Sequence, residues 1–256
     1  MKLIRGYLSI LSILALLLLC DPVQRLIIAP WVKLFPSQRI RVLNRWQKLM
    51  AVICTSPASI IGGARFPTVP TISSGPGVLI IMNHQSIFDI PQLVKLTPDA
   101  YPHLVTRKRY ARWIPLISHM IRLYQYPVVD PTANSREMKK SLRYLKEVAR
   151  TADVPIAIFA EGTRTRDGEI AKFRRRGLQM ILKQREWKVY AVVFDGFWER
   201  AKLKDFLRGM GDIRGQAEIA GEFEWTDPSA DSEAFIEQVR DQMVEHLAQM
   251  RETTPA

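Results

Sequence analysis

The residues best suited to chemistry are His84 and Asp89, which lie in the run NHQSIFD at residues 83–89. An imidazole has an unperturbed pKa of about 6.5 and can accept a proton near neutral pH. A carboxylate on the other ring nitrogen fixes the tautomer and stabilises the imidazolium that forms. The pair suits general-base catalysis, although by itself it also fits a histidine that caps a helix or packs in a core.

A second polar run, FAEGTRTR at residues 159–166, also follows an apolar segment. Gly162 allows a ligand to approach the backbone closely, Thr163 offers a hydroxyl, and Arg164 carries a planar guanidinium that matches a phosphate. Glu161 can hold Arg164 in place or bind a substrate hydroxyl. The run fits a site for a phosphorylated ligand, and a solvated glycine turn is the alternative. Three arginines at residues 174–176 either face phosphates or cover a helix start.

A folded domain must position these two runs, and the apolar segments predict its elements. Short apolar runs typical of buried strands alternate with stretches of helical periodicity. We expect strands at residues 77–82, 101–107, 126–129, 155–159 and 188–194, and helices at residues 38–61, 91–96, 114–123, 135–151, 174–184 and 231–251. Residues 213–225 are expected to form a late strand or a hairpin. The fold class is therefore α/β, a mixed or largely parallel sheet flanked by helices. Both polar runs follow strands, where ligand sites of such sheets gather.

The N-terminus predicts a membrane-associated helical segment. Residues 7–20 carry no charge, and extending the run back to Leu3 gives 18 residues interrupted only by Arg5. As a helix it would span about 27 Å, close to the bilayer core of about 30 Å. Asp21-Pro22 is expected to end this helix, and a shorter apolar run follows at residues 23–35.

Basic residues flank both ends of the apolar run, so charge bias does not favour one orientation for a single span. They fit better with a re-entrant helical hairpin that keeps both ends cytoplasmic, and a spanning helix stays open as the alternative. A cleaved signal peptide is less well supported, because no A-x-A-like site follows the run.

Composition limits the function classes. With 47 % hydrophobic residues the chain is not a disordered one, and two cysteines without C-x-x-C spacing exclude a disulfide framework. The 256 residues include 37 Lys and Arg against 25 Asp and Glu. The excess is concentrated at residues 101–185, with 19 basic and 7 acidic residues, whereas residues 186–256 have 8 and 15. Such a tract favours an anionic partner: phospholipid headgroups, a phosphorylated substrate or nucleic acid.

The two runs in this order, the second followed by FRRRG, resemble the glycerolipid acyltransferase family over roughly residues 77–195. The resemblance implies transfer of a fatty acyl group from acyl-CoA or acyl carrier protein to the hydroxyl of a lysophospholipid, foremost 1-acyl-sn-glycerol-3-phosphate. It implies that His84 is the general base and Asp89 its orienting partner. It also implies an acceptor-phosphate site formed by Glu161, Gly162, Thr163 and Arg164. No metal or resident cofactor is expected.

With this resemblance, residues 1–37 are predicted to be the membrane anchor or hairpin and residues 38–256 the catalytic domain. The location expected is the inner membrane, on an anionic phospholipid surface, with the catalytic domain facing the cytoplasm. Arg107 and Lys108 follow a predicted strand and are expected to border the site and steer anionic substrates. Pro131 stands where the family often has an arginine, and Arg136 is the nearest substitute. This departure leaves another lysophospholipid or a lyso-aminolipid open as the acceptor.

Two other classes of function compete with this interpretation. A serine hydrolase would use Ser86, but no G-x-S-x-G run occurs, and Ser86 is expected instead to cap the helix that begins near Asp89. A membrane-tethered binding protein would use the basic tract. Its tight clusters lie at residues 107–109 and 174–176, and no recognisable nucleic-acid module surrounds them, so nucleic acid is not expected as a partner.

Overall fold

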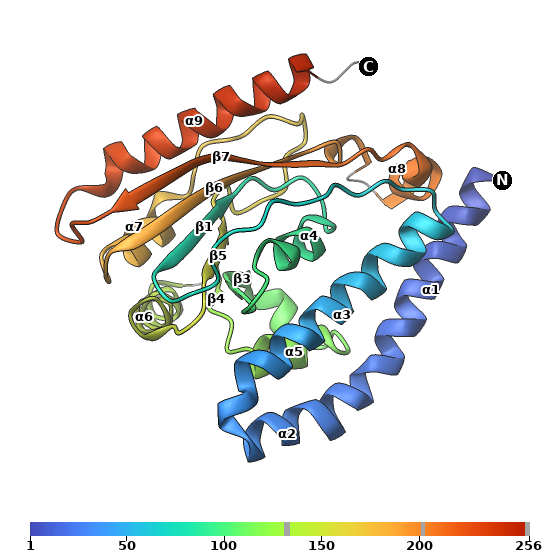
Figure 1. Cartoon of the computed structure of the whole chain (residues 1–256), viewed down its shortest axis with the longest axis horizontal. Coiled ribbons are helices and arrows are strands. Elements are labelled where there is room, and N and C mark those ends of the chain that lie inside the picture. The colour runs from blue at the N-terminus through green and yellow to red at the C-terminus, as the bar shows by residue number, and fades with distance from the viewer. Residues whose placement is uncertain (131–133, 201–202, 254–256) are drawn as a thin grey trace.

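The computed structural model describes residues 1–130, 134–200 and 203–253, and a five-stranded sheet forms its centre (Figure 1). The strands are β1 (Val78–Met82), β2 (His103–Leu104), β5 (Ile156–Phe159), β6 (Trp187–Asp195) and β7 (Gln216–Trp225). They lie in the order β2-β5-β1-β6-β7, and every neighbouring pair is parallel except β6 and β7. The predicted fold class, a largely parallel sheet flanked by helices, is confirmed.

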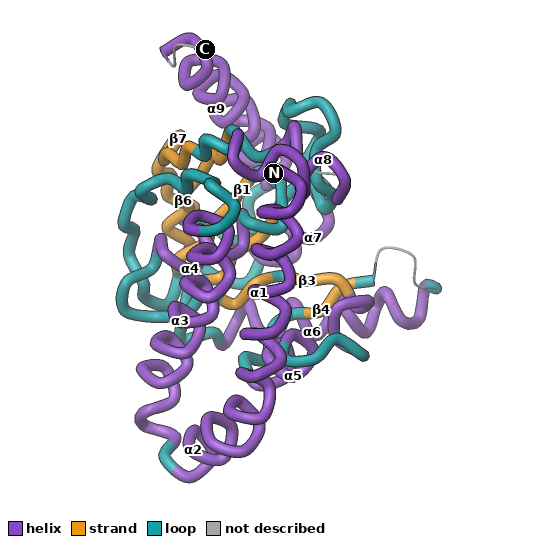
Figure 2. The backbone as a smooth tube through the Cα atoms, turned by 90° about the vertical axis from the view of Figure 1, so that its right-hand side faces the viewer, coloured by secondary structure: helices purple, strands orange, loops and turns teal. Residues whose placement is uncertain are grey.

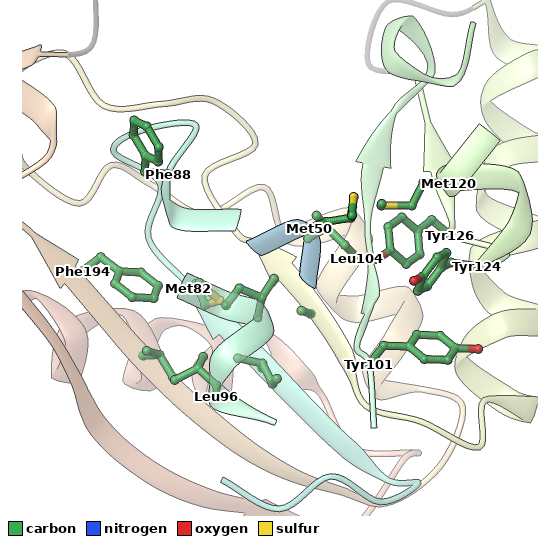
Figure 3. Close-up of a cluster of buried hydrophobic side chains, with 14 of the residues drawn as sticks. Met50, Met82, Phe88, Leu96, Tyr101, Leu104, Met120, Tyr124, Tyr126 and Phe194 are labelled. Atoms are coloured by element: carbon green, nitrogen blue, oxygen red, sulfur yellow. The ribbon is translucent and has the colours of Figure 1, made fainter. Parts of the chain in front are cut away.

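Helices cover both faces of the sheet, because β1 is apolar on both sides. Val78, Ile80 and Met82 pack in one core, while Leu79 and Ile81 pack in the other. The first core takes in residues of α3 (Arg39–Ile60), α4 (Asp89–Leu96) and α5 (Ile117–Leu123). The second takes in residues of α6 (Ser135–Thr151), α7 (Arg175–Leu182) and α9 (Ser232–Thr253). Figure 3 shows how the first core continues from Met82 and Leu96 to a group of buried tyrosines.

The expected strand at residues 101–107 is divided between two sheets. β2 pairs with β5 as far as Leu104, whereas β3 (Thr106–Arg107) pairs in parallel with β4 (Val128–Val129). The change of partner occurs within one residue: the Val105 amide donates to Ala157 O at 2.9 Å and the Thr106 amide to Pro127 O at 2.9 Å. Periodicity along a strand does not show a change of partner, so the sequence predicted one strand here.

Two other elements differ in detail from expectation. Of the two options for residues 213–225, a strand or a hairpin, the structure has one strand, β7, antiparallel to β6. A short helix, α8 (Leu203–Gly209), was not predicted. The C-terminal helix α9 (Ser232–Thr253) matches the prediction for residues 231–251, because its buried side chains recur at helical spacing.

The N-terminal helix does not end at Asp21-Pro22, so that prediction is wrong. α1 (Lys2–Val23) passes through Pro22, continues as a π-helical turn at Gln24–Ile28, and ends as α2 (Ala29–Leu34). A proline inside a helix removes one hydrogen bond and costs about 3 kcal/mol. Tertiary contacts favour the helical path: Asp21 Oδ1 accepts from the Leu116 amide at 2.6 Å, and Gln24 Nε2 donates to Leu116 O at 3.1 Å.

The chain then turns at residues 35–38, and α3 runs back along α1 and α2 as the second arm of a helical hairpin (Figures 1 and 2). The 33-residue helix Lys2–Leu34 is long and apolar enough to cross a bilayer. Many of its apolar side chains are exposed, among them Leu19 at 68 % and Leu26 at 75 %. Since both arms pack on the rest of the chain, the boundary at residue 37 stays a prediction.

Candidate active site

The two polar runs meet because β1 and β5 are parallel neighbours. Met82, the last residue of β1, is in register with Phe159, the last residue of β5. The segments that follow, residues 83–89 and 160–174, therefore leave the sheet at the same edge. They are joined there by two backbone hydrogen bonds, from the Ala160 amide to Met82 O and from the Thr165 amide to His84 O. The carboxyl edge of the sheet thus holds both runs, as ligand sites in such sheets commonly do.

His84 and Asp89 face one another at this edge. The distance from His84 Nδ1 to Asp89 Oδ2 is 2.8 Å, the carboxylate is fully buried, and the imidazole is 18 % exposed. Asp89 Oδ2 also accepts from the amides of Gln85 at 2.7 Å and Ser86 at 2.8 Å. Asp89 begins α4, where the helix dipole favours a negative charge. A carboxylate against Nδ1 places the proton on that nitrogen and leaves Nε2 as the basic one.

The orientation of the imidazole is fixed from a second side by Phe159. The two rings stack with centroids 4.0 Å apart and planes inclined by 20°. Asp89 holds one edge of the imidazole and the ring of Phe159 packs against its face. Together these contacts favour a single rotamer of His84. A general base must lie within hydrogen-bond reach of the proton that it removes, so this restraint serves base catalysis.

Glu161 joins the two runs rather than pointing outward. Its Oε1 accepts from the His84 amide at 3.0 Å, and its Oε2 accepts from the Ala171 amide at 3.0 Å. Burial raises the pKa of this carboxyl above its usual range, against hydrogen bonds that lower it. With 4 % exposure and both oxygens engaged, Glu161 supports the backbone of His84. This contact differs from both roles considered from the sequence.

The turn after Glu161 exposes the remaining residues of the predicted phosphate site. Gly162 has φ +69°, a conformation that favours glycine, and a Cβ there would lie 2.7 Å from Arg174 Cδ. Thr163 and Arg164 are exposed. Arg107 donates from Nη2 to Gly162 O, so it reaches the turn from β3. The structure therefore brings Arg107, Gly162, Thr163 and Arg164 to one rim beside His84.

Lys108 and Arg136 lie differently. Lys108 Nζ forms an ion pair with Glu137 Oε2 at 3.0 Å and lies 3.6 Å from Asp130 Oδ2, so it is turned toward α6. Arg136 is exposed on the first turn of α6. Pro131, the position that departs from the family pattern, falls outside the described residues. Substrate contacts of Lys108 and Arg136 stay predictions.

Ser86 does not have the geometry of a nucleophile. Its side chain is buried, and its hydroxyl accepts from the Phe88 amide at 3.4 Å within the same loop. The hydroxyl does not cap α4, because the helix has no side-chain cap. Asp89 itself accepts the loop amides instead, so the capping role expected of Ser86 is wrong.

Four polar residues that support the site were missed in the sequence. Gln85 Nε2 donates to Asp195 Oδ1 at 2.8 Å, and Gln85 Oε1 accepts from the Phe197 amide at 3.1 Å. Asp195 in turn pairs with Arg251 of α9 at 2.9 Å. Asn83 also bonds both backbone groups of Phe194 at 2.8 Å. The polar residues around His84 were a signal for Asn83 and Gln85, but no local pattern pointed to Arg251.

Among the described residues, no group of three or more His, Cys, Asp or Glu side chains is placed to hold a metal ion. What the site offers is a buried carboxylate, an imidazole with one basic nitrogen, and exposed guanidinium and hydroxyl groups beside it. This set can remove a proton from a hydroxyl and hold an anionic group nearby. It suits transfer of an activated group to an alcohol.

Comparison with known proteins agrees with this chemistry. Residues 65–195 match the model of the family described as Acyltransferase. A 1-acyl-sn-glycerol-3-phosphate acyltransferase of Cocos nucifera is 27 % identical over 167 residues, which make up 62 % of this chain and 48 % of that protein. The chain thus spans about half the length of this curated relative.

Among solved structures, the 1-acyl-sn-glycerophosphate (LPA) acyltransferase PlsC from Thermotoga maritima superposes with a TM-score of 0.70. The match covers 100 % of both chains at 15 % sequence identity. At that identity the likeness concerns the fold, including the N-terminal helices and the sheet that carries the two runs.

Proposed function

This chain belongs to the acyltransferase family, and we propose that it transfers a fatty acyl group from a thioester donor to the free hydroxyl of a lysophospholipid. The proposed acceptor is 1-acyl-sn-glycerol-3-phosphate, giving phosphatidate, and the donor is acyl-CoA or acyl carrier protein. The names of the Cocos nucifera and Thermotoga maritima proteins support this acceptor. The observation that carries the proposal is the 2.8 Å contact of His84 Nδ1 with buried Asp89, which leaves Nε2 basic at the rim.

In the proposed reaction, His84 Nε2 removes the proton of the acceptor hydroxyl as the oxygen attacks the thioester carbonyl. Asp89 stabilises the imidazolium that forms, through the hydrogen bond to Nδ1. The tetrahedral intermediate collapses by breaking the carbon–sulfur bond, and the imidazolium returns its proton to the departing thiolate. No covalent enzyme intermediate is formed, and no resident metal or cofactor takes part.

The acceptor phosphate would bind at the exposed turn beside His84. Arg164 and Thr163 supply a guanidinium and a hydroxyl there, and Arg107 adds a second guanidinium that already contacts the turn. This placement supports a phosphorylated lipid, rather than nucleic acid, as the partner of the basic surface. Glu161 would hold the backbone of His84 and leave the binding of substrate to its neighbours.

We also propose that the hairpin of α1, α2 and α3 binds a phospholipid membrane, at the cytoplasmic face of the inner membrane. Its exposed leucines would otherwise face water. A helix of 33 residues measures about 50 Å, more than the bilayer core of about 30 Å, so a tilted or re-entrant arrangement fits it. Lipid acceptors would then reach the site from the bilayer.

An activity matrix on the purified, detergent-solubilised chain tests the function. Acyl-CoA and acyl carrier protein donors are each combined with lysophosphatidate, other lysophospholipids and a lyso-aminolipid. We expect acyl transfer to lysophosphatidate, and a fall of about 10²–10⁴-fold in His84→Ala and Asp89→Asn with unchanged circular dichroism. A preference for another acceptor would correct the substrate, while full activity of His84→Ala would refute the mechanism.

A further inference from the structure

One tryptophan outside the helical hairpin is almost completely exposed. Trp113 lies in the segment between β3 and α5, and its side chain is 97 % exposed. The next residue, Ile114, is 37 % exposed. Tryptophan is usually at least half buried in soluble domains, and where its amphipathic ring faces outward it is characteristic of membrane interfaces.

The segment that carries Trp113 has a defined and strained backbone. Trp113 has φ +66° and Leu116 has φ +59°, both in the left-handed region that side chains other than glycine disfavour. Such strain persists only where the surrounding structure imposes it, and it is common at functional sites. The exposure of Trp113 is thus a property of the fold.

Hydrogen bonds hold this shape from within the segment. Ser118 Oγ donates to Tyr110 O at 3.0 Å and accepts from the Ile114 amide at 2.9 Å. Arg122 Nη1 also donates to Ala111 O at 3.1 Å. The tip is therefore closed across its base, with Trp113 at the turn.

The segment also connects the site with the N-terminal helix. At one end, Arg107 reaches Gly162 O beside His84. At the other end, both backbone groups of Leu116 bond the helix: its amide donates to Asp21 Oδ1 and its carbonyl accepts from Gln24 Nε2. Leu26 and Ile27, on the next turn of that helix, are exposed at 75 % and 57 %. Along the chain, Trp113 thus lies between Arg107, which reaches the rim of the site, and Leu116, which contacts the N-terminal helix.

Charge indicates which partner the segment fits. Residues 107–129 contain five Lys and Arg and no Asp or Glu. Arg109 and Arg112, which both precede the tip closely in the chain, are exposed. Basic residues near an anionic bilayer are each attracted by about 1 kcal/mol. An aromatic tip next to exposed arginines suits a lipid headgroup region better than a purely apolar protein surface.

We propose that Trp113 and Ile114 insert into the interfacial layer of an anionic phospholipid bilayer while Arg109 and Arg112 contact headgroup phosphates. Residues 108–116 then form a membrane contact separate from the hairpin. This second contact turns the rim of the His84 site toward the lipid. The inference rests on the proposed function, because it assumes a lipid acceptor drawn from a membrane. Beyond that function, it identifies residues 108–116 as the segment that orients the site toward the membrane.

The kinetic test uses the full chain reconstituted into phosphatidylglycerol-containing vesicles. Trp113→Ala should raise the apparent KM for a long-chain lysophosphatidate embedded in the vesicles by about tenfold, the factor expected for losing one partly buried aromatic side chain. The KM for a short-chain, monomeric lysophosphatidate in solution should not change. Tyr144→Ala, which removes an aromatic side chain 41 % exposed on α6, is the matched control and should leave both KM values unchanged.

A second measurement locates Trp113 without using activity. Vesicles with brominated acyl chains should quench the wild-type fluorescence more than that of Trp113→Phe, since only the wild type has this indole in the bilayer. Equal quenching of the two proteins would overturn the proposal. So would an equal rise of KM for soluble and vesicle-bound acceptor, which would place Trp113 in the site itself. If the wild type acylates neither acceptor, the proposed function fails, and quenching alone still decides whether Trp113 meets the bilayer.

Discussion

Arg251, close to the C-terminal end of α9, forms a bidentate ion pair with Asp195 at the end of β6. Arg251 Nε lies 2.9 Å from Asp195 Oδ2, and Nη2 lies 3.1 Å from Oδ1. Although burial acts to raise it, the hydrogen bonds from Arg251 and Gln85 hold the pKa of Asp195 below its ordinary value. Arg251 also bonds Glu169 at 2.7 Å. One guanidinium thereby links the end of β6 to the loop that follows β5, and Asp195 in turn accepts from Gln85 in the loop that follows β1.

We expect Arg251→Ala to lower kcat and to destabilise the fold by about 1–3 kcal/mol, because a partly buried carboxylate loses its charged donor. Gln85, whose backbone amide donates to Asp89 and whose side chain donates to Asp195, would then be held by a carboxylate that has lost its charged partner. The control is Arg150→Ala, which breaks an exposed pair with Glu147 and should leave stability almost unchanged, because solvent screens the pair. Urea unfolding and steady-state kinetics test both variants, and equal behaviour of the two would contradict the linking role.

Gly162→Ala should reduce both stability and activity. The position has φ +69°, and the added Cβ would lie 2.7 Å from Arg174 Cδ, so backbone strain of about 1–3 kcal/mol accompanies a shift of the turn. Gly77→Ala, at φ +77° and far from the turn, would place its Cβ 3.8 Å from Glu186 O, an ordinary contact, and should lose similar stability yet keep its activity. Gly75→Ala should be neutral in both. Full activity of Gly162→Ala would show that the shape of the turn is irrelevant to catalysis.

Glu161→Gln should lower kcat and cost about 1–3 kcal/mol, since an amide accepts only one of the two backbone hydrogen bonds. The effect depends on pH, because the pKa of Glu161 is raised on folding by burial. The native state then holds this proton more tightly than the unfolded chain. The stability that this proton contributes is fully present below the ordinary glutamate pKa. It is lost as pH rises through the pKa of Glu161 in the folded protein.

The stability gap between wild type and Glu161→Gln should therefore widen as pH is lowered from 7 toward 5. Chemical unfolding at several pH values measures the gap directly. A gap that stays constant across this range would mean that Glu161 titrates alike in the folded and unfolded chains.

Arg164→Ala should raise the KM for the lysophospholipid by about tenfold while kcat changes little, because a phosphate contact exists before the reaction begins. Arg143→Ala, which removes an equal charge from an exposed position on α6, serves as the comparison and should leave KM unchanged. A loss confined to kcat in Arg164→Ala would argue against its role as a phosphate anchor.

His103 should make the fold sensitive to acid. The side chain is 5 % exposed, and neither ring nitrogen has a hydrogen-bond partner among the described residues. Burial, assisted by the charge of Arg39, lowers the pKa of His103 to about 4. The pKa of His103 is lower in the folded protein than in the unfolded chain. The stability that the neutral ring contributes is therefore fully present above pH about 6.5 and is lost as pH falls toward 4.

His103→Phe removes this titration and keeps an aromatic ring beside Tyr101, on which His103 stacks. Between pH 7 and pH 4 the wild type should lose about 2–3 kcal/mol more than the variant. Unfolding free energies at both pH values test this, and parallel pH curves for the two proteins would contradict it.

Patterns of neighbouring residues along the chain were sufficient to predict the main strands and helices of this protein. An apolar run at residues 77–82 followed by NHQSIFD, and another at residues 155–159 followed by AEGTR, predicted strands that end in polar residues. Parallel strands of one sheet end at the same edge, so the meeting of His84 and Glu161 followed from the pattern. Hydrophobic spacing likewise predicted α6 and α9, because each buries one stripe of side chains.

Contacts between distant residues could not be predicted in this way. Helical structure at Pro22 depends on Asp21 and Gln24 bonding Leu116, and the change of strand partner at Val105 depends on where Pro127 lies. The ion pair of Arg251 with Asp195 joins residues 56 positions apart, and no sequence pattern near either residue indicates it.

The sequence by itself determined the element types and the two reactive runs, since periodicity and residue chemistry are local properties. Only the tertiary structure decided that Glu161 supports the backbone of His84, that Lys108 turns to α6, and that Trp113 is exposed. The physical reason is that a side chain's direction and burial depend on neighbours supplied by other elements. Those neighbours exist only once the sheet and its helices have packed.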